Sequence, residues 1–194
     1  MSVVDQSERG DLFSPSQRRT RVVEWQDPKP AARAAAAMSG LEVMYALRDG
    51  RMPPPPLARL IGFRMAEVGP GRIVMELDPE QSLENTVGLL HGAVAAALLD
   101  TAMGCAISTH LPAGQTSVTL DLKLTYLRPL TVRSGLIRAE GKVVKLGRQT
   151  SYTEGFVHDG DGKLAVHATA TFSMIGGPAP AAGTQTGASA KLEK

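Results

Sequence analysis

Residues 88–107 (GLLHGAVAAALLDTAMGCAI) constrain the fold most, because they form a nearly uninterrupted run of apolar and small residues. At roughly 20 residues the run is long enough to cross a bilayer. It nevertheless carries His91 and Asp100, and a central Asp costs about 3 kcal/mol on membrane-insertion scales. Amphipathic, strand-like segments follow it. We therefore predict a buried helix in a soluble α+β domain and no membrane partner.

Apolar and small residues occupy every side of this helix, which predicts that it is enclosed on all sides. Its many Ala and Gly residues would let a sheet or a second helix approach closely. Asp100 then lies in apolar surroundings, where an unpaired carboxylate is costly. Two explanations remain: Asp100 is a functional acid, or it hydrogen-bonds a neighbouring loop or another subunit.

Segments with the pattern of β-strands precede and follow the helix in the sequence. The clearest is residues 118–126, in which apolar and polar residues alternate over nine positions. A turn signal, Asp-Gly-Asp-Gly at 159–162, separates the last two expected strands. The predicted strands are residues 62–68, 72–77, 118–126, 136–144, 149–158 and 164–174. Two strands, a long helix and a four-stranded meander predict an α+β fold, with a six-stranded antiparallel sheet wrapped around one long central helix.

The flanking segments differ from this domain in composition. Residues 1–30 mix charges and prolines and predict a poorly ordered extension. Residues 31–58 predict an N-terminal helix over 31–48, followed by a Pro-rich linker that contains four consecutive prolines from 53 to 56. The domain itself is expected at 59–175, and the Gly/Ala/Thr-rich residues 176–194 are expected to be a mobile tail.

Charge and cysteine content exclude several classes of function. The 21 Lys+Arg and 19 Asp+Glu residues leave a formal charge of +2, too small an excess for a nucleic-acid binder. A lone cysteine, Cys105, excludes a disulfide framework and a Cys-based zinc site, and fits a reducing cytoplasm. The first residues contain no apolar secretory signal. No His, Asp or Glu spacing resembles a metal site, so we expect no metal.

The start of the long helix offers groups for acyl-transfer chemistry. Asn85, His91 and Gly92 lie where free backbone N–H groups and the positive end of the helix dipole are found. Because Gly92 has no side chain, a ligand oxygen can approach its amide closely, and an amide aimed at a developing oxyanion promotes acyl transfer. Each residue also has an ordinary explanation, as a turn asparagine, a loop histidine and a helix-start glycine.

The spacing of the two strongest candidates carries a further implication. Gly92 and Asp100 are eight residues apart, about 12 Å along a helix. One thioester carbonyl cannot easily touch both. If both are catalytic, they must come from two antiparallel helices related by a two-fold axis, which predicts an active site shared between subunits.

These residues together resemble a known family. Asn85 followed after five residues by His91-Gly92, with Asp100 nine residues after the histidine on an Ala-rich helix, resembles the hotdog-fold acyl-CoA thioesterases. Within them the pattern is most similar to the phenylacetic acid degradation-related (PaaI-type) branch. The tripeptides LRP at 127–129 and LGR at 146–148 are similar to that branch too, as are SGLE at 39–42 and the Pro-rich lead-in. The resemblance covers roughly residues 39–175.

The resemblance implies roles for five residues. Asp100 matches the family's acidic residue, either the nucleophile or the general base for water. The Gly92 N–H matches the donor that polarises the thioester carbonyl. His91 and Asn85 match positions that orient substrate or water, and Thr119 lies near a Ser/Thr position that places the attacking water. The chain departs from the family's His-Gly-Gly in having Ala at 93, which leaves the Gly92 amide in place.

The resemblance also implies an acyl-CoA substrate and a homo-oligomer, either a dimer or a dimer of dimers. Cationic side chains are expected to bind the phosphates of CoA. The candidates are Arg128, Lys145 and Arg148, together with the turn glycine Gly147. No separate cofactor is expected, because CoA is part of the substrate.

The expected activity is therefore hydrolysis of acyl-CoA thioesters to a carboxylate and free CoA. Two alternatives remain: a hotdog hydratase or dehydratase, and a non-catalytic acyl-CoA-binding or regulatory module. The sequence leaves open whether the acyl group is aromatic or aliphatic, and what the N-terminal extension does.

Overall fold

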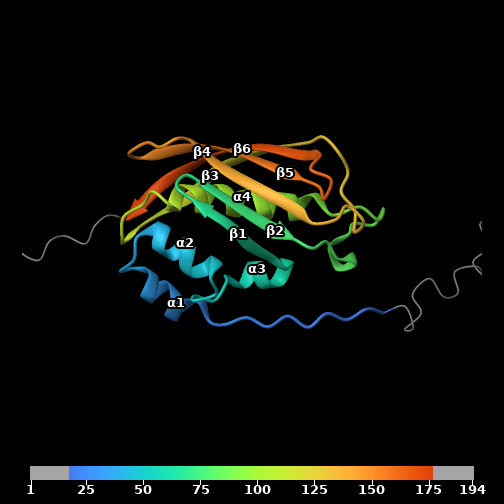
Figure 1. Cartoon of the computed structure of the whole chain (residues 1–194), viewed down its shortest axis with the longest axis horizontal. Coiled ribbons are helices and arrows are strands. Elements are labelled where there is room, and N and C mark those ends of the chain that lie inside the picture. Colours follow the sequence, from blue (N-terminus) through green and yellow to red (C-terminus); the bar gives the residue numbers. More distant parts are fainter. Residues whose placement is uncertain (1–17, 177–194) are drawn as a thin grey trace, which may run out of the picture.

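The computed structural model describes residues 18–176, in which a six-stranded antiparallel sheet packs one face against a long helix, α4 (Gly92–Ser108) (Figure 1). The predicted α+β architecture is confirmed. The strands are β1 (Phe63–Gly69), β2 (Arg72–Leu77), β3 (Gln115–Tyr126), β4 (Ile137–Lys145), β5 (Thr150–His158) and β6 (Leu164–Gly176). A 3-10 turn, η3 (Gln81–Leu83), precedes α4.

The strand order, β1-β2-β4-β5-β6-β3, corrects one predicted pairing. Strands β4, β5 and β6 form a meander, and the turn at 159–162 joins β5 to β6 as predicted. β3, however, pairs with β6 at the edge of the sheet, and β4 pairs with β2. The predicted four-stranded meander is therefore wrong, because alternation along a strand identifies the strand and not its neighbour.

β3 also departs from strict alternation. A β-bulge between Thr119 and Asp121 shifts the register against β6. After the bulge Leu122 packs against the core, whereas Val118 before it and Leu120 within it are 44% and 59% exposed. A bulge adds one residue to one strand and so reverses which side chains face inward.

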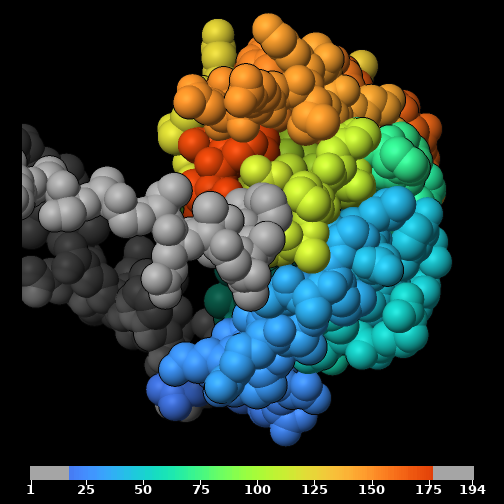
Figure 2. All heavy atoms as spheres, turned by 90° about the vertical axis from the view of Figure 1, so that its left-hand side faces the viewer, coloured from blue at the N-terminus to red at the C-terminus, as the bar shows by residue number. Residues whose placement is uncertain are grey.

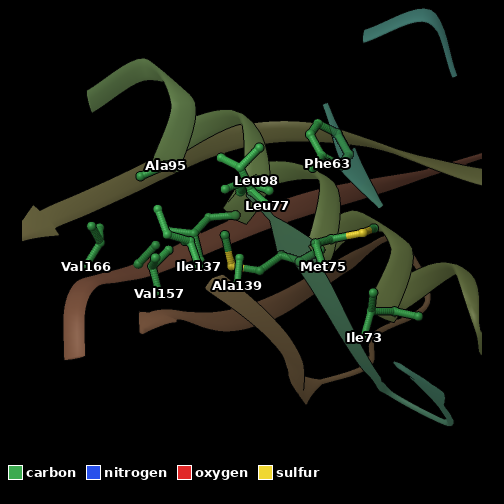
Figure 3. Packing of buried hydrophobic residues seen from close by; sticks show 14 of the residues in the cluster. Phe63, Ile73, Met75, Leu77, Ala95, Leu98, Ile137, Ala139, Val157 and Val166 are labelled. Atoms are coloured by element: carbon green, nitrogen blue, oxygen red, sulfur yellow. The ribbon is translucent and has the colours of Figure 1, made fainter. Parts of the chain in front are cut away.

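The core lies between α4 and the sheet. Leu98 is fully buried and points toward the strands that carry Leu77, Ile137 and Ala139 (Figure 3). Eight residues of α4 are buried: Val94, Ala95, Leu98, Leu99, Ala102, Met103, Ala106 and Ile107. Burial of this apolar surface is the main stabilising contribution to the domain.

The prediction that α4 is enclosed on all sides is wrong for a single chain. Ala93 is exposed, and Ala96, Ala97, Asp100 and Gly104 are only partly buried. These five residues, which we call the small-residue face of α4, form the stripe of the helix that a single chain leaves partly open, although Gly104 still lies close to the Phe172 ring of β6. The helical wheel could not show this, because small apolar residues on one face look alike whether a sheet or another subunit covers them.

The N-terminal extension contains three helices, α1 (Pro28–Ala35), α2 (Gly40–Arg48) and α3 (Pro56–Ile61). The predicted single helix over 31–48 is therefore wrong. Ser39 starts a new helix there through a capping box with Glu42, whose carboxylate accepts the Ser39 N–H at 2.8 Å. The predicted linker is shorter than expected as well, since Pro56 begins α3; the first turn of a helix tolerates proline.

The extension packs onto the domain. α2 contacts β1 and α4, and Gly40 allows the close approach, because a Cβ there would lie 1.8 Å from the Ser108 carbonyl oxygen. Figure 2 shows the blue extension helices directly against the yellow-green carboxyl-terminal part of α4. Residues 1–17 of the predicted poorly ordered extension (1–30) and residues 177–194 of the predicted tail (176–194) lie outside the described residues. Within the described part both boundaries are wrong, because α1 begins at Pro28 and β6 ends at Gly176. No helix within 18–176 is long and apolar enough to cross a membrane.

The outer face of the sheet carries a network of ion pairs. Arg72 donates to Glu67 at 2.7 Å and also pairs with Glu140, and Arg138 pairs with Glu67. The hydrogen bond from Arg72 holds the pKa of Glu67 below its usual 4.5. Since this pKa is lower in the folded than in the unfolded state, the stabilisation is present above pH 4.5 and is lost as the pH falls through the folded-state value.

We expect Glu67→Gln to lower the free energy of unfolding by about 0.5–1 kcal/mol at pH 7, a small effect because the carboxylate is 43% exposed. Urea unfolding at pH 7 and pH 3 measures it. The difference between variant and wild type should shrink at pH 3. A difference of the same size at both pH values would contradict this assignment.

Candidate active site

The start of α4 leaves one backbone donor without a partner. His91 caps the helix: its Nδ1 accepts the Ala93 N–H at 3.0 Å, and its carbonyl accepts the Val94 N–H at 2.9 Å. The Gly92 N–H has no acceptor within residues 18–176. This amide lies at the positive end of the α4 dipole, so it can donate to a ligand oxygen.

Tyr126, which the sequence did not single out, fixes the next peptide group. Its hydroxyl donates to the Gly92 carbonyl at 2.8 Å. Partial burial raises the pKa of Tyr126 above 10.0, so the phenol keeps its proton at neutral pH. A Cβ on Gly92 would lie 3.1 Å from this hydroxyl, which gives a packing reason for glycine at this position. The contact joins residues 34 apart, and no local pattern could have indicated it.

Asn85 organises the loop before the helix. Its Oδ1 accepts the N–H groups of Val87 and Leu89 at 3.0 and 3.1 Å. Because the side-chain oxygen is used within the loop, the amide NH2 is the part of Asn85 that can orient a substrate. The role that the family resemblance implies for Asn85 stays a prediction.

A pocket of about 270 Å³ brings four of the predicted site residues together: Asn85, His91, Gly92 and Arg128. Tyr126 also lines it. The rest of the wall is largely apolar, formed by Leu89, Leu90, Ala95, Leu127, Pro129, Leu130 and Val166.

Asp100 lies further along α4, partly buried, and accepts a hydrogen bond from the Thr119 hydroxyl at 2.8 Å. The structure thus brings Asp100 and Thr119 together, although 19 residues separate them in sequence. The bulge next to Thr119 allows the contact, because it turns that side chain toward the helix.

Within one chain the acid and the amide do not converge. Asp100 is not among the residues that line the Gly92 pocket. Along β6, Thr119 pairs opposite Phe172 and Tyr126 opposite Val166, a separation of about 20 Å at 3.3 Å per residue. Each chain therefore holds the predicted acid and the predicted amide donor at two separate places.

The predicted CoA-binding residues are divided in the same way. Lys145, Gly147 and Arg148 line a hollow of about 750 Å³ at the β4–β5 turn. Arg128 lies at the other end of β6, where its N–H donates to Ala165 at 3.1 Å. Within residues 18–176, no group of three or more His, Cys, Asp or Glu side chains is placed to hold a metal ion.

Comparison with known proteins places these features in a family. A sequence model of the thioesterase superfamily matches residues 87–166. The proofreading thioesterase EntH of Klebsiella pneumoniae is 32% identical over 103 residues, 53% of this chain and 74% of that protein. The chain therefore belongs to the thioesterase superfamily. The matched segment contains every predicted site residue except Asn85.

Two further relatives support this family assignment. Human acyl-coenzyme A thioesterase 13 is 26% identical over 96 residues, 49% of this chain and 67% of that protein. The crystal structure of a phenylacetic acid degradation-related protein from Ralstonia eutropha superposes on this thioesterase-superfamily chain with a TM-score of 0.61 and 28% identity, covering 67% of this chain and 98% of that one. The expected hotdog thioesterase fold is confirmed.

Tyr126→Phe tests the bond that holds the Gly92 peptide. We expect it to lower the free energy of unfolding by about 0.5–1 kcal/mol, the lower part of the range for one hydrogen bond, because Tyr126 is 54% exposed. Tyr152→Phe is the matched control, since Tyr152 is also exposed and has no side-chain hydrogen bond within residues 18–176. Equal effects of the two substitutions in chemical unfolding would show that the bond contributes nothing.

Proposed function

We propose that this protein hydrolyses acyl-CoA thioesters to a carboxylate and free CoA, as a member of the PaaI-type branch, at an active site shared by two subunits. The observation that carries the proposal is the unpartnered Gly92 N–H together with Asp100, held by Thr119, on the same helix. The names of the relatives, a proofreading thioesterase and an acyl-coenzyme A thioesterase, support the reaction.

The small-residue face of α4 supports a two-fold assembly. Its residues are too small to keep a neighbouring helix at a distance, and they surround Asp100. Two such helices packed antiparallel bring Asp100 of one subunit near Gly92 of the other, which compensates for the roughly 12 Å between these residues along one helix. A dimer is sufficient for this, and pairing of dimers is compatible with it.

The chemistry then follows from the two groups. The Gly92 N–H donates to the thioester oxygen and stabilises the negative charge that develops there. Asp100 has two possible routes. As a nucleophile it attacks the carbonyl carbon and expels the CoA thiolate, leaving an anhydride that water hydrolyses; as a general base it takes a proton from the attacking water. Thr119 orients the carboxylate in either route, and no cofactor takes part.

The same two-fold arrangement would bring the predicted CoA-binding side chains of two subunits together. Arg128 of one subunit and Lys145, Gly147 and Arg148 of the other would lie on one side of the shared site and bind the phosphates of CoA. Arginine is suited to this because its planar guanidinium can donate two parallel hydrogen bonds to a phosphate.

Release of free CoA thiol from phenylacetyl-, benzoyl-, short-chain and long-chain acyl-CoA tests the activity. We expect turnover by the wild type and a loss of about 10²–10⁴-fold in kcat for Asp100→Asn. Asp161→Asn is the matched control, because Asp161 is an exposed carboxylate in the β5–β6 turn. Full activity of a folded Asp100→Asn variant would exclude the mechanism. Binding of acyl-CoA without turnover by both proteins would favour a binding module.

Mixing two inactive variants tests whether the site is shared. Gly92→Pro removes the N–H donor at the first position of α4, where proline is tolerated, and His91 already has the extended backbone that a following proline requires. Gly92→Ala is its control, because it adds the same Cβ 3.1 Å from the Tyr126 hydroxyl but keeps the N–H. When the Gly92→Pro and Asp100→Asn variants are denatured and refolded together, about a quarter of wild-type activity should return. Half of the dimers are then mixed, and each mixed dimer has one intact site of its two. No restoration from two folded variants would place the whole site in one chain.

A further inference from the structure

The N-terminal extension closes a second hollow that the proposed reaction has not yet used. This hollow, which we call the extension pocket, has a volume of about 790 Å³, within the roughly 300–1,000 Å³ of small-molecule sites. It lies between the extension, the first two strands and α4. Its apolar lining is formed by Leu47, Met52, Pro53, Pro54, Pro55, Ala58, Phe63, Met65, Met75 and Cys105.

Most of the extension pocket lies outside the segment that defines the family. Of its lining residues, only Thr101 and Cys105 fall within residues 87–166, which the superfamily model matches. The remaining wall comes from residues 21–75. The pocket is therefore formed mainly by the N-terminal extension and the first two strands, and three methionines give it an adaptable apolar wall.

The extension pocket adjoins the proposed catalytic acid. Thr101 follows Asp100 directly on α4, and the Thr101 hydroxyl is already bonded to the Ala97 carbonyl at 2.7 Å. Burial, and to a smaller extent the charge of Asp100, raises the pKa of the Cys105 thiol to about 12. Asp100 itself does not line the pocket, but the pocket wall begins at the next residue of the helix, Thr101.

The charged residues that line the pocket itself are all cationic. Five arginines line it, at positions 21, 48, 51, 59 and 64, and no Asp or Glu does. Four of the five have carboxylate partners that lie outside the lining. Arg59 is exposed and has no ion-pair partner within residues 18–176. One cation is therefore available at the edge of an apolar cavity, which suits a ligand with an apolar body and a single anionic group.

We propose that the extension pocket is the acyl-binding subsite of this enzyme, and that it selects acyl groups with an apolar body and a carboxylate at the end remote from the thioester. The apolar wall holds the body, and Arg59 binds the terminal carboxylate. The inference rests on the proposed thioesterase function, and it gives the N-terminal extension a task, which is to determine substrate specificity.

Two substitutions in the full-length protein test the subsite. Met52→Trp fills the apolar part, and Arg59→Gln removes the free cation. Each is assayed with acetyl-CoA and with two longer acyl-CoA thioesters of equal length, one ending in a methyl group and one in a carboxylate. Leu57→Trp is the matched control for Met52→Trp, because Leu57 is an exposed residue of the same extension and does not line the pocket.

We expect Met52→Trp to lower kcat/KM for both longer thioesters, relative to acetyl-CoA, by about tenfold or more. Arg59→Gln should lower kcat/KM for the carboxylate-ended substrate about fivefold relative to the methyl-ended one. If Met52→Trp affects all three substrates equally, or resembles Leu57→Trp, the pocket is not the acyl subsite. If Arg59→Gln affects both longer substrates equally, the arginine does not recognise the acyl group.

A binding measurement separates this inference from the thioesterase proposal. Trp25 is the only tryptophan of the chain, and together with Arg59 it lines a small hollow beside the pocket. Titration with a free dicarboxylic acid of similar length should change its fluorescence in the wild type and less in Arg59→Gln. A change without any thioesterase activity would support the pocket and overturn the function. Turnover with no change in fluorescence would overturn the pocket.

Discussion

The packing of one long apolar helix against a six-stranded sheet is the constraint on which the rest of the structure depends. Leu98, Leu99, Ala102 and Met103 are completely buried against the strands, so the helix can neither rotate nor slide without exposing apolar surface to water. This fixes the direction of every other side chain on α4. Asp100 is held beside the edge strand β3, where Thr119 donates to it, and the helix start is held at the Tyr126 end of the same strand.

The rigidity of α4 also keeps the two predicted site groups on this helix apart. A straight helix keeps Gly92 and Asp100 at a set separation, and no change of side-chain rotamer can bring an acid to an amide two turns away. The chain instead exposes the face that carries Asp100. In the proposed shared site, the acid and the amide become neighbours when two copies of the same helix lie side by side in opposite directions.

The N-terminal extension adds a different kind of element to this conserved arrangement. Its helices pack through a glycine onto the end of α4, and its proline-rich loop lies over β1 and β2 without joining the sheet. In a segment attached in this way, the residues that line the pocket can change without disturbing the core, because few residues of the segment are buried. It is therefore a suitable place for specificity to vary among proteins that share the same catalytic helix.

The sequence by itself determined the elements and the candidate residues. Alternation, apolar runs and turn residues depend on near neighbours, so they placed all six strands and α4 within a few residues, and the spacing of Asn85, His91, Gly92 and Asp100 pointed to acyl transfer. Only the tertiary structure decided which strands pair, that a bulge turns Thr119 toward Asp100, that Tyr126 holds the Gly92 peptide, and that the helix is open on one face. These features join residues far apart in sequence, and their energies come from packing between elements, which no local pattern records.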